Sequence, residues 1–301
     1  MQSCGKFLEI YKKDKTFRVQ TPEALDPEET NENVPWVATP VADVGSANPI
    51  VSRVFMQACD ILSAAIFEIK VDKDRLISDL HSIKETLLTC ERIFDKLYVE
   101  TEEIRKEIES KGVELERGRM LNPFPHITDL DQQATAFLIQ AKRALVLIGG
   151  LPQYFFDIPS RGAHFHKLEA QLKEKCGAET DLVRFVSGVA DEVKHIVDLR
   201  NYQEHPDKKS TVIENYSLTP DVSVMAPQWT ISGEESRFIT EEMYDIVVFE
   251  FLLAESFFIH LVQHNLSTKF SYIFVQTREE DLDKNCPIMF RLEIDPSAYG
   301  L

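Results

Sequence analysis

Apolar residues recur at steps of three and four along most of the chain, and this spacing predicts several amphipathic helices. The first long pattern covers residues 73–118, either as one very long helix or as two helices with a break near Val99. Residues 50–68 differ because apolar side chains lie almost all round the segment, a pattern that predicts a buried helix. The further predicted helices are 128–150, 163–175, 178–204 and 237–265.

Residues with special backbone roles mark the ends of two of these helices. Thr128 is the predicted N-cap of the helix over 128–150, with Asp131 three residues later. The pair Gly149-Gly150 is the predicted end of this helix. Gly177 closes the short helix over 163–175.

The hydrophobic period changes to two after Pro206. Residues 210–218 and 222–232 alternate and flank a turn at 219–221, so they are predicted to form a β-hairpin inserted between helices. Two further strands are predicted over 270–276 and 287–294, and they could join this hairpin in a small antiparallel sheet.

The N-terminal segment shows no long periodic pattern. We expect residues 1–48 to be irregular and largely extended, with an acidic loop over 22–33. Within this segment, residues 6–11 and 16–20 alternate in part and could pair as a hairpin.

These elements predict a mainly α fold with a small antiparallel β element made of the hairpin and the C-terminal strands. Two prolines in residues 121–126 break the chain and mark a predicted domain boundary. The expected regions are an irregular N-terminal segment (1–48), an N-terminal helical region (50–120), a helical bundle (125–265) with an inserted hairpin (210–232), and C-terminal strands (268–301).

Composition limits the class of protein. A chain of 301 residues that is 44% hydrophobic can build a sizeable core in one or two domains. No run approaches the roughly 18–20 apolar residues of a membrane span, and no signal-peptide core follows Met1, so we expect a cytoplasmic protein without a membrane partner. The 5 cysteines are widely spaced, which predicts free thiols and neither a metal site nor a cofactor.

The net charge of −17 disfavours non-specific binding of nucleic acid over most of the surface. An RNA ligand would therefore need a local group of cations.

The most specific chemistry lies at the end of the helix predicted over 178–204. Its apolar stripe, continued four residues beyond Ile196, places the guanidinium of Arg200 where another aliphatic side chain is expected. A half-buried arginine is costly unless it is paired or in use. Asn201 and His205 are four residues apart and share the neighbouring face. Pro206 predicts that the helix ends just before His205, which gathers the three side chains at one helix C-terminus.

The pattern Arg200-Asn201-x-x-x-His205, at the end of a long helix and before a proline, resembles the signature of HEPN domains. These are all-α bundles found in RNA-cleaving toxins, antiviral ribonucleases and non-catalytic relatives. The resemblance covers about residues 125–265. It implies a HEPN-like bundle and a homodimer whose cleft forms from two motif helices. It also implies a metal-independent ribonuclease of toxin or defence type, with RNA as substrate and an antitoxin or regulatory protein as a further partner.

The resemblance also implies a role for each residue. His205 would move a proton to or from the reacting oxygens, and Arg200 would hold the scissile phosphate. Asn201 would orient either His205 or the phosphate. The products would carry a 2′,3′-cyclic phosphate and a 5′-hydroxyl. Lys208 and Lys209 could add positive charge just past the motif, whereas Glu204 places a negative charge inside it.

Other readings of the same residues remain open. Arg200 could pair with Glu192, Asp198 or Glu204, in a HEPN-like interaction or regulatory module without catalysis. A catalytic site requires Arg200 and His205 to be exposed in one cleft, whereas the module predicts internal pairing. A third class is a binding protein with a pocket between the β element and the bundle. His260 and His264, four residues apart, could place two imidazoles on a metal, although no H-E-x-x-H pattern is present.

Overall fold

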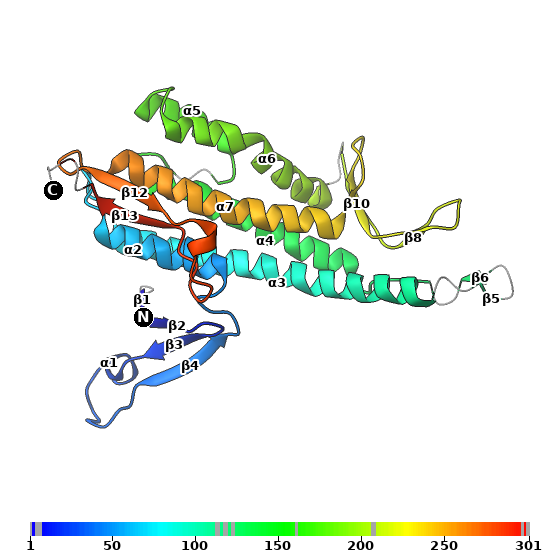
Figure 1. Cartoon of the computed structure of the whole chain (residues 1–301), viewed down its shortest axis with the longest axis horizontal. Helices are drawn as coiled ribbons and strands as arrows, with labels where there is room; N and C mark the ends of the chain where they lie inside the picture. The colour runs from blue at the N-terminus through cyan, green and yellow to red at the C-terminus, as the bar shows by residue number, and fades with distance from the viewer. Residues whose placement is uncertain are drawn as a thin grey trace.

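Long helices packed side by side form the body of the molecule (Figure 1). The computed structural model describes residues 2–3, 8–111, 115–116, 120–121, 124–159, 162–205, 209–295 and 298. About 55% of the chain is helical, which confirms the mainly α class. The helices of the bundle are α3 (Lys73–Lys111), α4 (Leu130–Gly150), α6 (Asp181–Glu204) and α7 (Ile239–Asn265), with the shorter α5 (Phe165–Cys176) against α6.

Helix α3 is continuous over 39 residues, so the alternative of a break near Val99 is wrong. No proline or glycine interrupts its sequence. Its apolar residues stay on one side from Leu76 to Leu97, both fully buried, and that side packs against α4 and α7.

The predicted buried helix over 50–68 is present as two consecutive pieces. A π-helical segment, η1 (Ile50–Met56), runs directly into α2 (Gln57–Ala64). Gln57 is buried, and its Oε1 accepts hydrogen bonds from the backbone N–H groups of Met289 and Phe290, at 2.8 and 2.7 Å. This side chain therefore ties α2 to the C-terminal end of the chain.

The ends of α4 differ in part from the prediction. The residue before α4 is Asp129, which has a φ of 60° and makes no side-chain capping hydrogen bond, so the assignment of Thr128 as N-cap is wrong. The helix ends at Gly150, as predicted, and continues as the 3-10 turn η2 (Leu151–Tyr154). A Cβ atom at Gly149 would lie 2.7 Å from the carbonyl oxygen of Gly162, so this position needs glycine for a close backbone approach.

The predicted hairpin between α6 and α7 is confirmed. Strand β7 (Thr211–Glu214) pairs with β10 (Gln228–Ile231), and β10 also pairs with β11 (Arg237–Phe238). Nearer the turn, β8 (Ser217–Leu218) pairs with β9 (Val224–Met225).

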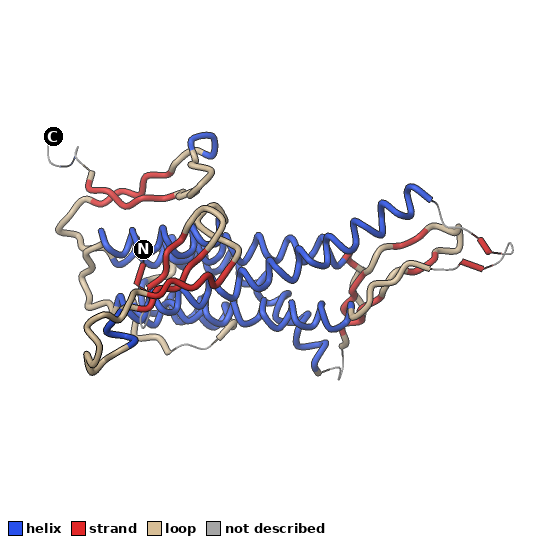
Figure 2. The backbone as a smooth tube through the Cα atoms, turned by 90° about the horizontal axis from the view of Figure 1, so that it is seen from below, coloured by secondary structure: helices blue, strands red, loops and turns tan. Residues whose placement is uncertain are grey.

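The C-terminal strands do not join this hairpin. Strand β12 (Tyr272–Gln276) pairs with β13 (Phe290–Ile294) in a separate two-stranded sheet, with the 3-10 turn η3 (Glu279–Asp281) between them. Figures 1 and 2 show the two sheets at opposite ends of the bundle. The reason is the length of α7, whose 27 residues separate the two sheets by roughly 40 Å.

The N-terminal segment is more regular than expected. The predicted hairpin is present as β2 (Leu8–Tyr11) and β3 (Thr16–Gln20), but β1 (Gln2–Ser3) and β4 (Val37–Ala42) extend it to a four-stranded antiparallel sheet. Helix α1 (Pro22–Leu25) begins the connection between β3 and β4. The expectation of an irregular segment over 1–48 is therefore wrong. A further small pair, β5 (Leu115–Glu116) and β6 (Met120–Leu121), follows α3.

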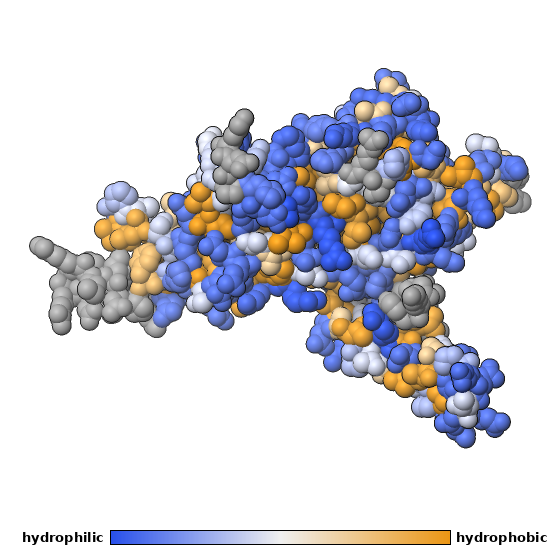
Figure 3. Space-filling model, turned by 180° about the vertical axis from the view of Figure 1, so that it is seen from behind, coloured by the Kyte–Doolittle hydropathy of each residue, from blue (hydrophilic) through white to orange (hydrophobic). Residues whose placement is uncertain are grey.

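The buried side chains on both sides of the predicted boundary at 121–126 belong to one connected core, which includes η1, α2 and α3 as well as α4 to α7. Leu130–Tyr154 is long and apolar enough to cross a membrane by length and composition alone. However, 56% of its most apolar window is buried, as in a core helix of a bundle. On the face opposite to that of Figure 1, apolar side chains lie in patches between polar ones (Figure 3).

One carboxyl group lies inside this core without a partner. Glu250 of α7 is fully buried, and neither of its oxygens has a hydrogen-bond partner among the described residues. Burial raises the pKa of Glu250 well above its ordinary value. Folding therefore favours its protonated form, and its contribution to stability falls as the pH rises above the pKa it has in the unfolded chain.

We predict that Glu250→Met stabilises the protein by about 1–3 kcal/mol at pH 8, because an unbranched apolar side chain replaces an unsatisfied buried polar group. The gain is expected to be smaller at pH 5, where the unfolded chain also holds the proton for part of the time. Urea unfolding of both proteins at the two pH values measures this difference. Equal or lower stability of the variant at pH 8 would contradict the prediction.

Candidate functional site

The end of α6 places the predicted motif next to α4. The helix ends at Glu204, and the backbone N–H of His205 donates to the carbonyl oxygen of Asn201 at 2.8 Å. The predicted helix end is therefore confirmed. Thr180 caps the other end of α6 through its hydroxyl group, which accepts from the N–H of Val183. Pro206 and Lys208 lie outside the described residues.

Glu204 contacts both Arg200 and His205. Arg200 donates from Nη2 to Oε1 of Glu204, one helical turn further on. The other carboxylate oxygen, Oε2, lies 3.7 Å from Nε2 of His205. The side chain of Arg200 is 21% exposed and that of His205 is 71% exposed, so the cluster opens to solvent on the side of the histidine.

Lys142 of α4 is a member of this cluster that the sequence analysis missed. Its Nζ donates to Oδ1 of Asn201 at 2.7 Å. Burial and the nearby guanidinium of Arg200 lower the pKa of Lys142, and the carboxylate of Glu204 opposes this change. The sequence does carry a signal, because Lys142 is four residues after Leu138 and three before Leu145, at the edge of the apolar stripe.

Lys209 does not belong to the cluster. Its Nζ pairs with Oε1 of Glu234 at 3.1 Å and lies 5.6 Å from the ring centroid of Tyr202. The structure therefore assigns it to the start of the hairpin, and the prediction that it contacts a phosphate beside Arg200 gains no support.

The cluster has the groups needed to hold a phosphate. Arg200 and Lys142 are cations, His205 carries an imidazole, and Asn201 links α4 to the motif helix. One carboxylate, Glu204, partly balances this charge. His205 is the one histidine among the described residues of this cluster, and its Nε2 faces Oε2 of Glu204.

A second group of charges joins the N-terminal sheet to α3. Glu9 of β2 accepts from the hydroxyl of Tyr11 at 2.6 Å, and its Oε2 lies 3.0 Å from Nε2 of His81 and 3.2 Å from Nζ of Lys84. Arg18 donates to Oε1 of Glu9 at 3.1 Å. Glu9 and Lys84 are each 1% exposed, so this is a buried ionic contact.

The same group has the spacing of a metal site, since one ligand atom each from Glu9, His81 and Glu85 lies within 4.8 Å of the others. However, Nζ of Lys84 lies 2.8 Å from Oε1 of Glu85 and 3.2 Å from Glu9. The ammonium group thus occupies the position of a cation between the two carboxylates. We therefore assign the cluster a structural role.

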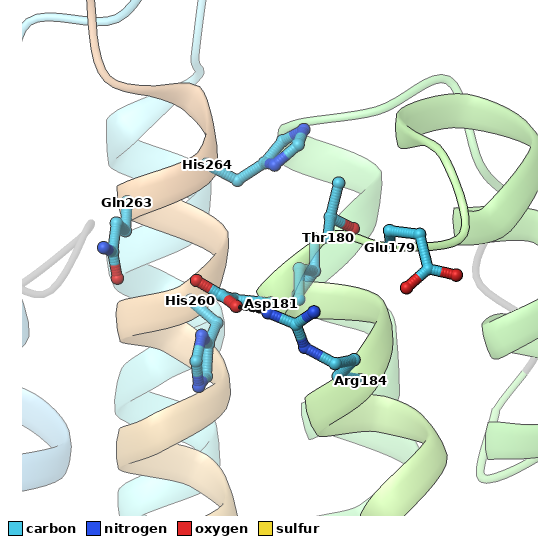
Figure 4. Close-up of a pocket in the computed structure, with 8 residues that line it drawn as sticks. Glu179, Thr180, Asp181, Arg184, His260, Gln263 and His264 are labelled. Atoms are coloured by element: carbon cyan, nitrogen blue, oxygen red, sulfur yellow. Dashed lines mark hydrogen bonds and ion pairs between the residues drawn. The ribbon is translucent and has the colours of Figure 1, made fainter.

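The histidine pair of α7 lines a hollow of about 360 Å³ beside the start of α6 (Figure 4). The ring of His260 lies tilted against Phe185, with 4.6 Å between centroids, and the ring centroid of His264 lies 5.6 Å from that of Phe156. The two imidazoles thus face different aromatic partners and do not converge on one point. Burial lowers the pKa of both histidines, so both are neutral at neutral pH.

A hollow of about 490 Å³ lies between the end of α7 and β12, lined on its two sides by residues such as Gln263 and Phe274. A binding protein with a pocket between the bundle and a β element, the third class considered from the sequence, would have its pocket in such a position. Its lining shows no cluster of titratable groups, so it defines no chemistry.

The fold and the cluster define a mainly α protein with small antiparallel sheets and a group of polar and charged side chains at the end of one bundle helix. No protein-family model, no curated protein and no solved structure matches the chain. The functional argument therefore rests on the residues themselves.

Proposed function

We propose that the chain is a HEPN-like, metal-independent endoribonuclease that binds an RNA phosphate through Lys142, Arg200, Asn201 and His205. The observation that carries this proposal is the hydrogen bond from Lys142 to Asn201, because it adds a second permanent cation to a motif selected from sequence alone. The resemblance further suggests a cytoplasmic toxin or defence protein with an antitoxin or regulatory partner.

In the proposed reaction, an imidazole takes the proton of a ribose 2′-hydroxyl, and the oxygen attacks the adjacent phosphorus. The bond from phosphorus to the 5′-oxygen breaks, and a protonated imidazole supplies the proton that this oxygen gains. Arg200 and Lys142 stabilise the charge that develops on the phosphate oxygens. The products are a 2′,3′-cyclic phosphate and a 5′-hydroxyl.

This sequence of steps needs two proton carriers, whereas one copy of the cluster contains one histidine. A dimer that brings two copies of His205 to one phosphate supplies both. The proposal therefore includes a homodimer.

Purified protein in EDTA is expected to cleave single-stranded RNA and to leave 2′,3′-cyclic phosphate ends. The same sequence made of 2′-deoxynucleotides is expected to remain intact, because the attacking hydroxyl is missing. Gel analysis of end-labelled substrates measures both results. Cleavage of the deoxy substrate, or the absence of cleavage of several RNAs by the folded dimer, would contradict the proposal.

A second candidate is a non-catalytic HEPN-like interaction or regulatory module. The pairing of Arg200 with Glu204 inside one helix favours this alternative, because a guanidinium held by its own chain is less available to a phosphate. The cleavage assay separates the two candidates, since the module has no activity to lose.

A further inference from the structure

Glu204 contacts the two side chains that would hold a phosphate in the proposed function. Its two carboxylate oxygens divide between Arg200 and His205, one oxygen toward each. A phosphate held by the same two side chains would also present one oxygen to each of them. The carboxylate and the substrate phosphate therefore compete for the same two partners.

Lys142 of the neighbouring helix α4 also lies close to these charges. Lys142 is close enough to both Arg200 and Glu204 for each to influence its proton affinity. Two permanent cations and one carboxylate thus lie around Asn201, and the carboxylate reduces the local positive charge available to an anion.

Glu204 can leave this position at little cost. It is the last residue of α6, and 34% of its side chain is exposed. An ion pair between side chains one helical turn apart that both keep contact with solvent contributes little to stability, and Arg200 retains 21% of its side-chain exposure. Rotation of one side chain is enough to release Arg200.

We propose that Glu204 is a built-in competitor that holds the phosphate site closed, and that an RNA phosphate opens the site by displacing the Glu204 carboxylate from Arg200 and His205. This inference rests on the proposed function and adds its regulation. A polyanion that also reaches Lys142 displaces the carboxylate, whereas an isolated monovalent anion competes poorly.

The experiment compares wild-type protein with Glu204→Gln in two measurements. The first is the affinity for a fluorescent, non-cleavable 2′-O-methyl RNA, and the second is the rate of RNA cleavage. The glutamine keeps the length of the side chain and removes its charge, so affinity is expected to rise about fivefold at low ionic strength. The gain is expected to shrink as salt increases.

Asp198→Asn is the matched control. Asp198 lies on the same helix and forms the same kind of pair, with Lys194 four residues before it, and among the described residues it pairs with neither Arg200 nor His205. This variant changes the net charge by the same amount. If it raises the affinity as much as Glu204→Gln does, the effect is one of total charge and the inference is wrong.

The remaining outcomes separate the inference from the function on which it rests. Wild-type cleavage with unchanged binding and rate in Glu204→Gln would overturn the inference alone. Tighter binding by Glu204→Gln without cleavage by either protein would support the competitor and overturn the ribonuclease. The absence of RNA binding by both folded proteins would overturn both.

Discussion

Arg200→Ala and His205→Ala are each expected to lower the rate of RNA cleavage by about 100-fold or more. In the proposed reaction, Arg200 would supply the planar donors that hold the phosphate, and His205 would be the proton carrier from each copy of the chain. Loss of either group removes an interaction that strengthens as charge develops in the reaction. The rate constant under single-turnover conditions, measured in EDTA, reports this loss.

The controls remove the same kinds of side chain elsewhere. Arg184→Ala deletes a guanidinium near the other end of α6, where it pairs with Asp181. His166→Ala deletes a half-exposed imidazole on α5. Both are expected to cleave RNA at the wild-type rate. Equal activity of Arg200→Ala and the wild type would exclude the motif as the catalytic site, even if the protein cleaves RNA by another route.

Glu9→Gln is expected to destabilise the protein by about 3 kcal/mol at pH 7, because it breaks a buried ion pair and leaves the partner with the half-exposed carboxylate of Glu85 at 2.8 Å. The partner here is Lys84, which is as deeply buried as Glu9 itself. Burial alone would raise the pKa of Glu9, but the hydrogen bond with His81 and the charge of Lys84 outweigh burial and lower it well below the ordinary value.

The pH dependence follows from this direction. Because the pKa of Glu9 is lower in the folded protein, its contribution to stability is present above the pKa of the unfolded chain. That contribution is lost as the pH falls toward the folded value. The difference in unfolding free energy between the wild type and Glu9→Gln should therefore shrink in acid. Denaturant unfolding at pH 7 and pH 4 measures it. Glu28→Gln, on the exposed connection between β3 and β4, is expected to leave stability unchanged.

The long helices could be predicted because their signals are local. The apolar stripe that includes Ile196 lies within α6, and the glycines at 150 and 177 lie at the ends of α4 and α5. The hairpin after α6 was predictable for the same reason, since its alternation and turn lie within residues 210–232. The N-terminal sheet escaped prediction because β4 contains Pro40 and is exposed along most of its length, so neither composition nor burial pattern is typical of a strand.

In the candidate site, too, some residues could be selected from the sequence and others were found only in the structure. Arg200, Asn201 and His205 were selected from sequence because a cation interrupts an apolar stripe at a helix end. Lys142 lies 59 positions from Asn201, and no pattern in either helix states that the two helices are neighbours. The role of Glu204 was also open, because the sequence allowed Arg200 to pair with Glu192, Asp198 or Glu204.

By itself, the sequence determined where helices form, which faces they bury and which residues carry unusual chemistry, since these depend on periods of two to four residues. The tertiary structure decided that the C-terminal strands lie far from the hairpin. It also decided that Lys142 meets Asn201 and that Glu9 is buried against Lys84. These features depend on how distant segments pack around one core, and a contact between distant residues leaves no periodic trace in either segment.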